Sequence, residues 1–357
     1  MRIGIDAREL CGRATGVGRY LSGLLGEWAK DAHGHEFVLY ATDELSQTLD
    51  GRAFARRRVA GLGGTTWEQI ALPKAIAADR LDVWFAPAYT APLRLDIPVV
   101  LAVHDLSFFA RPDWFTLREG LRRRWITARS VSAAAHVITI SNFSKRELME
   151  RLNVSADRID VIPPGISISR QPSAIGHSPR VLFVGSLFTR RHVPDLIRAF
   201  APIARRRADA VLDIAGDNRT YPRVYPRVTI AHEGIVSQVN WHAYVSDSQL
   251  RGLYDSARAF AFLSEYEGLG LTPLEALAAG LPPVLLDTAI ARESCEDAAL
   301  YVPVGDLKAT TDALERALFD EAERQRLLSA APAVLAKYQW PDAAERTLRV
   351  LERCSRS

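Results

Sequence analysis

Two glutamates flank a glycine-rich stretch in the second half of the chain. Glu267 follows an apolar run, Glu275 lies beyond seven intervening residues, and Gly268 and Gly270 stand between them. Glycines let an anionic ligand approach the backbone closely, and a carboxylate at the end of a buried strand needs a polar partner, such as a sugar hydroxyl. The combination favours a binding site over a purely structural role for this pair.

The same stretch carries the signals of a helix start. Thr272 and Glu275 have the spacing of a capping box, Pro273 would occupy the first helical position, and Gly280 would end the helix. Backbone N–H groups at such a helix start can bind a phosphate, because they carry the positive end of the helix dipole. Alternatively, Glu275 has no ligand and serves only to cap the start of this helix.

Two adjacent arginines follow another apolar run. Arg190 and Arg191 come shortly after Gly185 in VGSLFTRRH, in the same half of the chain as the glutamates. Two guanidinium groups at the carboxyl end of a strand can clamp a diphosphate through bidentate hydrogen bonds. An isolated Arg-Arg pair is usually a solvated loop edge, but the position after a strand favours the phosphate clamp.

The first half of the chain contributes weaker signals. The segment 12–20, with Gly16 and Gly18, resembles a dinucleotide-binding fingerprint, but Leu21 stands where the third glycine belongs. The segment could therefore form either a flexible loop or a glycine loop that closes over an acceptor or phosphate, and the sequence does not decide between them. His104 ends the apolar run VVLAVH, and this position at a strand end favours a functional role over a structural one.

The segment 111–129 is rich in arginine and aromatic residues. It carries six arginines against two acidic residues, together with Trp114, Phe115 and Trp125. Such a sequence could form a helix on a membrane surface. Alternatively, the helix is an ordinary amphipathic one, with a solvated face and an apolar stripe that packs on the core. The sequence does not decide between these two possibilities.

Apolar, β-branched runs recur between segments with helical periodicity. Runs that are apolar throughout are typical of parallel strands covered by helices, and their alternation with helices predicts a doubly wound α/β fold. The first half contains such runs at 3–6, 37–41, 83–88, 98–105, 136–141 and 159–165, and the second at 180–185, 210–216, 228–234, 259–264, 282–287 and 299–306.

The length of 357 residues suits two domains. A stretch rich in Ser, Pro and Gly at 166–180 predicts the linker between them. We therefore expect Rossmann-like domains at 1–170 and 171–337 that face each other across a cleft, with ligands bound beyond the carboxyl ends of the strands.

Composition excludes several classes of protein. Hydrophobic residues at 48% and charged residues at 24% are typical of soluble globular proteins, and a net charge of +3 gives no ground for a nucleic-acid partner. The three dispersed cysteines argue against a disulfide framework or a zinc cluster and favour a reducing compartment. No signal peptide and no apolar run of membrane-spanning length is evident, so we expect a cytoplasmic protein.

Taken in order, these motifs resemble those of glycosyltransferase family 4, whose members have the GT-B fold and retain the anomeric configuration. EGLGLTPLE resembles the family's two-glutamate signature, and VGSLFTRRHVPDLIRAF resembles its donor-phosphate loop. IGIDAREL with TGVGRY, VHDLSFF, VITISNFSKREL and VIPPGI resemble segments of its first domain. The segment 338–357 contains a match to the C-terminal helix that crosses back to that domain.

The resemblance implies roles for individual residues. Glu267 would contact hydroxyls of the donor sugar, Glu275 would hold the ribose hydroxyls, and His104 would face the transferred sugar. Arg190 and Arg191 would bind the diphosphate. The other implied donor-site positions are Gly16, Gly18, Gly185, Ser186, Gly268, Leu269, Gly270 and Leu271. Ser186 stands where many members have Arg, Arg191 where Lys is usual, and Leu269 where Phe is common.

The resemblance implies a retaining glycosyltransferase of bacterial surface polysaccharide assembly. GDP-mannose is the favoured donor, and a saccharide or lipid-linked saccharide is the expected acceptor. No metal or other cofactor is expected, because the arginines and the helix start would stabilise the charge that grows on the leaving diphosphate. Contact with the inner membrane through 111–129 would place the protein at its cytoplasmic face. A sugar-nucleotide epimerase of the same fold and an inactive nucleotide-sugar-binding subunit stay open as alternatives.

Overall fold

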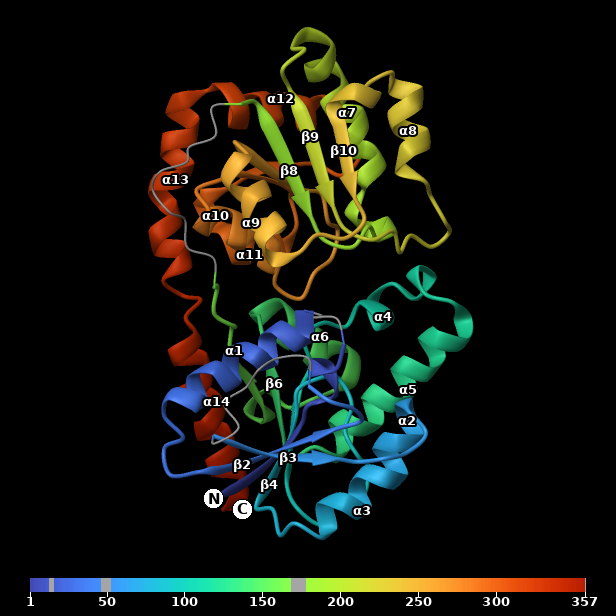
Figure 1. Ribbon diagram of the computed structural model, residues 1–357, viewed down its shortest axis with the longest axis vertical. Coiled ribbons are helices and arrows are strands. Elements are labelled where there is room, and N and C mark those ends of the chain that lie inside the picture. Colours follow the sequence, from blue (N-terminus) through green and yellow to red (C-terminus); the bar gives the residue numbers. More distant parts are fainter. Residues whose placement is uncertain (13–15, 46–52, 168–177, 357) are drawn as a thin grey trace. The chain divides into compact units, whose positions relative to one another are not determined.

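The computed structural model describes residues 1–12, 16–45, 53–167 and 178–356. The chain divides into two compact units (Figure 1). Unit 1 comprises Met1–Gly165 and Tyr338–Ser357, and unit 2 comprises Ile166–Lys337. The expected linker at 166–180 lies for most of its length outside the described residues.

Unit 1 is built on a seven-stranded parallel sheet in the order β3-β2-β1-β4-β5-β6-β7. Its central strands are buried throughout because helices cover the sheet. The strands are β1 Arg2–Asp6, β2 Glu36–Ala41, β3 Phe54–Arg58, β4 Val83–Ala86, β5 Val99–Ala102, β6 His136–Thr139 and β7 Ile159–Val161. The helices are α1 Gly16–Lys30, α2 Gly64–Thr66, α3 Leu72–Ala77, α4 Ser107–Ala110, α5 Leu117–Ala133, α6 Asn142–Leu152 and α14 Trp340–Ser355, with a π-helical turn η2 at Trp67–Ala71.

The C-terminal helix α14 belongs to unit 1, where it packs against α1 and lies over β4, β5 and β6. Trp340 anchors its first turn. A Cβ atom added to Gly23 or Gly165 would come within 2.4 Å of Trp340, so both glycines make room for this residue. The indole N–H of Trp28 donates to the carbonyl of Ala344 at 3.2 Å.

Unit 2 contains a six-stranded parallel sheet in the order β10-β9-β8-β11-β12-β13. The strands are β8 Arg180–Val184, β9 Val211–Ala215, β10 Val239–His242, β11 Ala259–Phe262, β12 Pro283–Leu286 and β13 Leu300–Val302. The helices are α7 Val193–Arg206, α8 Pro226–Glu233, α9 Asp247–Ser256, α10 Leu271–Ala278, α11 Ala289–Cys295, α12 Leu307–Phe319 and α13 Glu321–Leu335. Both units therefore confirm the predicted parallel α/β class.

Three strand predictions need correction. The run 228–234 is not a strand, because Pro226 opens helix α8 and Gly234, at φ 72°, ends it. The strand in its place is β10, an edge strand that the sequence analysis missed because its polar residues are only partly buried. The edge strand β3 was missed for the same reason, since four of its five residues are exposed.

The predicted glycine loop at 12–20 is also wrong in part. Gly16 and Gly18 lie in the first turn of α1, where Gly16 is exposed and Gly18 is buried. Residues 13–15 lie outside the described residues. Among the described residues, no helix is long and apolar enough to cross a bilayer.

Candidate functional site

The strand order of unit 2 places the arginine and glutamate motifs at one point of the sheet. The order reverses between β8 and β11, the adjacent strands from which the chain departs in opposite directions. Ligands of open α/β sheets bind outside the carboxyl ends of the strands at such a point. Arg191 follows β8 and Glu267 follows β11, so the topology brings together side chains that are 76 positions apart.

Arg191 and Glu267 form an ion pair that only partly uses their bonding capacity. The Arg191 Nε donates to Glu267 Oε1 at 2.8 Å, and its Nη1 donates to the carbonyl of Ser186 at 2.8 Å. The hydroxyl of Ser264 donates to the same Oε1 at 2.9 Å. Within the part of the chain that the structure describes, Arg191 Nη2 and Glu267 Oε2 make no hydrogen bond. The pair therefore offers a cationic donor and an anionic acceptor side by side.

Aromatic rings hold the two arginines in place. The guanidinium of Arg191 lies 4.8 Å from the ring centroid of Phe262 and 5.3 Å from that of Phe188. The guanidinium of Arg190 lies 4.3 Å from the Phe188 centroid, and its Nε donates to the carbonyl of Tyr266 at 3.2 Å. Such cation–π contacts restrict the guanidinium planes without neutralising their charge.

Glu267 is ionised in this setting. Burial by itself raises the pKa of its carboxyl, but the charges of Arg191 and Arg190 and the hydrogen bonds from Arg191 and Ser264 outweigh that effect. The pKa of Glu267 therefore lies below its usual value. A buried carboxylate that stays charged can accept a hydrogen bond from a ligand hydroxyl.

Gly185 is required where β8 ends. Its φ of 141° is rarely adopted by other residues, and an added Cβ would lie 2.7 Å from Arg191 Nη1. The next residue, Ser186, donates its hydroxyl to Asp217 Oδ1 at 2.6 Å. The absence of a side chain at 185 thus lets the guanidinium lie against the strand end.

The capping box predicted at Thr272 and Glu275 is not formed. Helix α10 begins at Leu271, two positions before the expected Pro273, because Gly270 adopts a left-handed conformation at φ 88° and starts the helix. No side chain caps this helix start. Glu275 lies in the second turn, where its Oε2 accepts a hydrogen bond from the hydroxyl of Tyr254 on α9 at 3.2 Å.

A small pocket in unit 2 adjoins the ion pair. Predicted positions Glu267, Leu269 and Gly270 all line it, and Gly268 lies between them in sequence. Its other walls come from β11, β12, α10 and the start of α11, with Phe262, Ser264, Pro273, Leu285, Thr288, Ile290, Ala291 and Ser294. The glycine-rich loop and the helix start thus meet at one concave surface.

Sequence reasoning missed three supporting side chains. The His192 Nδ1 lies 3.0 Å from Asp195 Oδ2 and its Nε2 lies 2.5 Å from Glu265 Oε1, which ties the arginine loop to the glutamate loop. Ser264 positions Glu267, and Tyr254 positions Glu275. The place of Ser264 at the end of an apolar run was a usable signal, whereas nothing local marks Tyr254.

His104 lies in unit 1, at the carboxyl end of β5. It is buried between the rings of Tyr20 and Tyr89, at centroid distances of 4.7 and 5.5 Å, and its Nε2 lies 2.7 Å from the carbonyl of Pro87. The carbonyl can only accept, so this nitrogen carries the proton. Burial holds the pKa of His104 below its usual value, despite the Pro87 bond and the charges of nearby carboxylates. Its imidazole is therefore neutral at pH 7.

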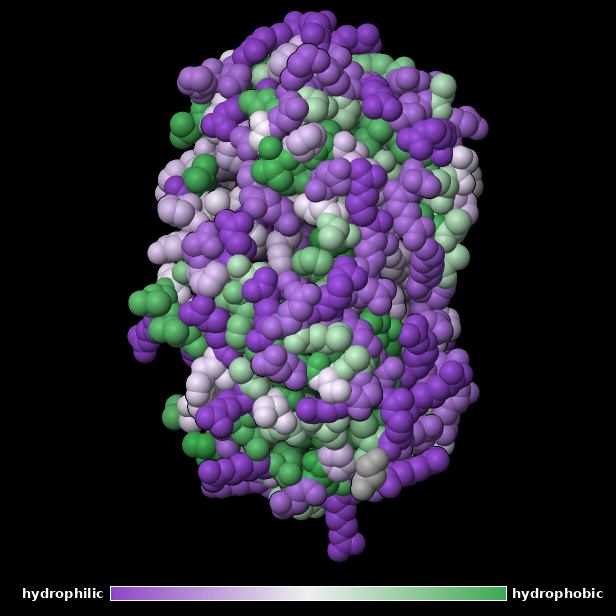
Figure 2. All heavy atoms as spheres, turned by 180° about the vertical axis from the view of Figure 1, so that it is seen from behind, coloured by the Kyte–Doolittle hydropathy of each residue, from purple (hydrophilic) through white to green (hydrophobic). Residues whose placement is uncertain are grey.

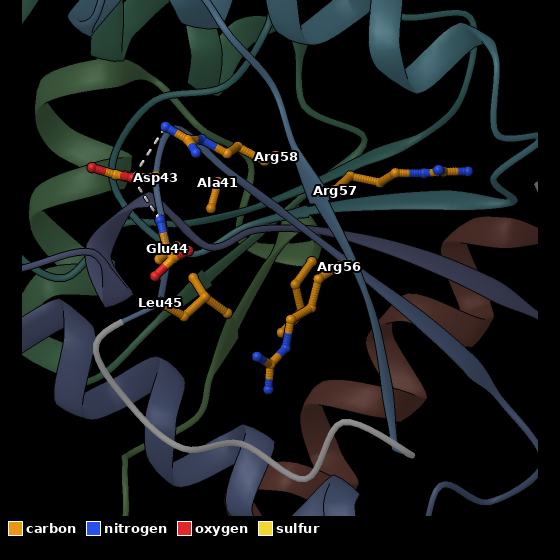
Figure 3. Close-up of a pocket in the computed structure, with 8 residues that line it drawn as sticks. Ala41, Asp43, Glu44, Leu45, Arg56, Arg57 and Arg58 are labelled. Carbon is orange, nitrogen blue, oxygen red and sulfur yellow. Dashed lines mark hydrogen bonds and ion pairs between the residues drawn. The ribbon is translucent and has the colours of Figure 1, made fainter.

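A second pocket lies at the edge of the sheet in unit 1, between β2 and β3. It is lined by Leu39, Ala41, Asp43, Glu44, Leu45, Arg56, Arg57 and Arg58. Figure 3 shows Arg58 beside Asp43, and the two side chains approach to 3.4 Å. Arg57 pairs with Asp79 at 2.7 Å. None of the predicted site residues lines this pocket.

The two halves of the chain match two family models. Residues 14–170 match the model described as Glycosyltransferase Family 4, and residues 166–334 match that described as Glycosyl transferases group 1.

Individual relatives are distant. O-antigen chain mannosyltransferase B of Escherichia coli is 24% identical over 294 residues, which cover 74% of this chain and 73% of that protein. GDP-mannose:cellobiosyl-diphosphopolyprenol alpha-mannosyltransferase of Xanthomonas oryzae is 26% identical over 260 residues, covering 71% and 67%. The structure of Anabaena HepE in complex with UDP and glucose superimposes with a TM-score of 0.78 and 17% identity over 99% of this chain and 100% of that one.

Proposed function

This chain belongs to the GT-B glycosyltransferases that combine a family 4 domain with a group 1 domain, and we propose that it is a retaining mannosyltransferase that uses GDP-mannose. The proposed acceptor is a saccharide or lipid-linked saccharide of bacterial surface polysaccharide assembly. The names of the relatives from Escherichia coli and Xanthomonas oryzae support mannose as the sugar, GDP-mannose as the donor and a diphosphopolyprenol-linked saccharide as an acceptor type.

The proposal rests mainly on the ion pair of Arg191 and Glu267, in which Arg191 Nη2 and Glu267 Oε2 make no hydrogen bond within the described residues. A nucleoside diphosphate sugar presents phosphate oxygens beside sugar hydroxyls. Arg191 Nη2 would donate to a phosphate oxygen, and Glu267 Oε2 would accept from a sugar hydroxyl. The uncapped start of α10 beside Gly270 would add backbone N–H groups directed at the anion.

The same groups account for the proposed chemistry. The bond from the anomeric carbon to the diphosphate breaks, so negative charge grows on the leaving oxygen, and a prepositioned guanidinium stabilises that charge where it forms. Neither Arg190 nor Arg191 has to move far, since Phe188 and Phe262 already hold them. We propose that the acceptor hydroxyl attacks from the face that the diphosphate leaves and passes its proton to the leaving phosphate, which retains the configuration.

Turnover of GDP-mannose with and without acceptors tests this function. We expect GDP-mannose to raise the melting temperature of the protein, because a ligand that binds only the folded state stabilises it. GDP release should then require a mannose-accepting saccharide. An epimerase would convert the sugar nucleotide without any acceptor, and an inactive subunit would bind the donor and release no GDP. Stronger stabilisation by UDP-glucose than by GDP-mannose would overturn the choice of donor.

Activity is expected to survive an excess of chelator. The charge on the diphosphate would be met by Arg190, Arg191 and the start of α10. In the described part of the chain, no three His, Cys, Asp or Glu side chains gather as metal ligands. GDP release measured in EDTA should therefore match that measured with added magnesium. Loss of activity in EDTA with recovery on adding magnesium or manganese would contradict the arginine clamp.

Glu275→Ala is expected to weaken donor binding with little effect on the chemical step. Glu275 would hold the ribose hydroxyls, and its hydrogen bond from Tyr254 fixes its carboxylate. Loss of that bond costs about 1 kcal/mol of stability. Tyr254→Phe removes the same bond but keeps the carboxylate, so it serves as the matched control. Calorimetric titration with GDP should show a clear rise in Kd for Glu275→Ala and a smaller one for Tyr254→Phe. Equal Kd values for wild type and Glu275→Ala would refute the ribose role.

A further inference from the structure

A segment of unit 2 repeats a short aromatic and cationic sequence. Residues 221–224 and 225–228 both read Tyr-Pro-Arg-Val. The side chains of Tyr221 and Tyr225 are 49% and 58% exposed, and Arg223 and Arg227 are exposed as well. These two tyrosines and two arginines are called the 221–227 surface below.

This segment begins at the edge of the sheet that carries the proposed donor site. In Figure 1 the chain continues from the arrowhead end of β9 out beyond the sheet before it returns to α8. The N–H of Leu187, after β8, donates to the carbonyl of Asp217, after β9, at 2.7 Å. The hydroxyl of Thr189, two positions before Arg191, accepts a hydrogen bond from the N–H of Tyr221 at 3.0 Å and donates one to its carbonyl at 2.8 Å. The segment is thus bonded directly to the arginine loop of that site.

Polar side chains hold the first copy of the repeat in shape. The hydroxyl of Thr220 accepts a hydrogen bond from the N–H of Val224 at 2.8 Å, and the amide of Asn218 donates to the carbonyl of Val224 at 2.7 Å. The Arg223 Nη1 donates to the carbonyl of Asn218 at 2.9 Å. The proline of each copy further restricts the backbone. A ligand therefore meets side chains on a backbone that is already ordered, which lowers the entropic cost of binding.

The second copy is fixed against the same edge of the sheet. Pro226 opens α8, and the guanidinium of Arg227 in its first turn lies 5.6 Å from the ring centroid of Trp241 in β10. The indole N–H of Trp241 donates to the carbonyl of Gly216, directly after β9, at 2.9 Å. Both copies are thus attached near the carboxyl ends of β9 and β10, at the edge where α/β sheets bind their ligands.

The 221–227 surface carries uncompensated positive charge. The stretch 218–232 holds three arginines and no acidic residue. Arg219 pairs with Asp217 at 2.5 Å. Within the part of unit 2 that the structure describes, neither Arg223 nor Arg227 forms an ion pair. Two guanidinium groups are therefore available to an anionic ligand.

The tyrosines suit a hydrophilic ligand with ring-shaped units. Among the described residues, the hydroxyls of Tyr221 and Tyr225 make no hydrogen bond. A tyrosine offers an apolar ring face to C–H groups and a hydroxyl to polar groups, and few of its torsions are lost on binding. On the face of the molecule in Figure 2, hydrophobic side chains lie in separate groups among hydrophilic ones. That face thus shows no broad apolar patch of the kind that binds a protein partner.

We propose that the 221–227 surface binds an acidic saccharide chain, the part of the acceptor that extends away from the reacting hydroxyl. The tyrosine rings would pack against C–H groups of the sugar rings, and Arg223 and Arg227 would bind sugar carboxylates. A repeated recognition sequence suits a ligand whose own units repeat. The guanine base of the donor fits less well, because it carries no negative charge. The inference rests on the proposed function, in which the acceptor is a saccharide, and adds that its chain is anionic.

Calorimetric titration of the full chain with sugar oligomers tests the inference. We expect oligomers of mannuronic acid to bind more tightly than mannose oligomers of the same length, and added salt to weaken this binding. The double variant Tyr221→Ala, Tyr225→Ala should bind the acidic oligomers at least about tenfold more weakly, and so should Arg223→Gln, Arg227→Gln, since each loses two contacts. The neutral oligomers should respond to the tyrosine variant but little to the arginine variant.

A matched control removes a similar aromatic and cationic pair at the amino ends of the strands of unit 2. Phe319 ends α12 and is 41% exposed, and the guanidinium of Arg207 lies 4.7 Å from its ring centroid. The double variant Phe319→Ala, Arg207→Gln should bind the acidic oligomers as wild type does. Equal binding by wild type and the tyrosine variant would overturn the inference, as would tighter binding of the neutral oligomers than of the acidic ones.

Titration with GDP separates this inference from the proposed function. Both double variants of the 221–227 surface should bind GDP as wild type does, and a raised Kd would assign the surface to the donor base instead. A wild type that binds acidic oligomers through these side chains but does not respond to any nucleotide sugar would refute the proposed function and leave the saccharide surface intact. A wild type that turns over GDP-mannose but binds no acidic oligomer would refute the inference alone.

Discussion

Replacing Glu267 by alanine is expected to lower the turnover number about ten- to hundredfold. The variant loses the Oε2 acceptor beside the reacting sugar and leaves the guanidinium of Arg191 without its carboxylate. A hydrogen bond to a charged group contributes about 1.5–3 kcal/mol, and each 1.36 kcal/mol corresponds to tenfold in rate. Steady-state kinetics with GDP-mannose as the donor measures the effect, with circular dichroism to confirm folding.

Glu265→Gln is the matched control for this prediction. It removes a carboxylate two positions away that contacts His192 and leaves the Arg191 pair intact. Its turnover should stay much closer to wild type. Ser264→Ala should fall between the two, because it removes only the hydroxyl that positions Glu267 Oε1. Full turnover in Glu267→Ala would show that the site has been assigned to the wrong carboxylate.

Replacing Glu267 by glutamine should change the pH dependence of stability. The pKa of Glu267 is lowered in the folded protein, so its ionised form stabilises the fold above the ordinary carboxyl pKa of about 4.3. That contribution is lost as the pH falls through the lower, folded-state value. The difference in unfolding free energy between wild type and Glu267→Gln should therefore be largest near neutral pH and shrink on acidification, as measured by urea denaturation.

Replacing Arg191 by alanine is expected to lower the turnover number about tenfold or more. Arg191 Nη2 would meet the leaving diphosphate, and this contact strengthens as negative charge grows in the transition state. Arg191→Lys should recover part of the activity, since a lysine restores the charge but cannot bond Glu267, Ser186 and a phosphate in one plane. Kinetics of both variants with GDP-mannose gives the comparison.

Arg198→Ala provides the control for loss of positive charge. Arg198 lies on α7, is 45% exposed and pairs with Asp195, so its removal should leave turnover nearly unchanged. The double variant Arg191→Ala, Glu267→Ala should lose less than the product of the single effects, because each single variant already disables the pair. An Arg191→Ala enzyme with unchanged turnover and only a raised KM would mean that the arginine attracts the donor without stabilising the leaving charge.

The amino-acid sequence was sufficient for the fold class and for most of the core. Buried parallel strands are apolar throughout, and eleven of the thirteen observed strands begin within or beside a run recognised from that property alone. The exceptions follow from the same physics. Strand β3 exposes its arginines and β10 exposes its polar residues, while α8 contains β-branched residues in a helix bounded by Pro226 and Gly234.

The sequence also singled out Glu267 and Arg191, because each stands just after an apolar run where a parallel sheet places its ligands. The sequence did not show that these two side chains pair directly. The ion pair depends on β8 and β11 being neighbours, which the strand order decides, and on Gly185 and Phe262 leaving one pocket for the guanidinium. The partners Ser264 and Tyr254 likewise come from tertiary packing.

Predictions from local sequence patterns were least reliable where a residue adopted a positive φ angle. The spacing of Thr272 and Glu275 matched a capping box, but Gly270 adopted a positive φ and began helix α10 before Thr272 could cap it. Glu275 instead accepts a hydrogen bond from the hydroxyl of Tyr254. The sequence by itself determined which residues can carry charge and which runs are buried. The tertiary structure decided which charges meet, because hydrogen bonds and ion pairs act over a few ångströms that only the assembled sheet defines.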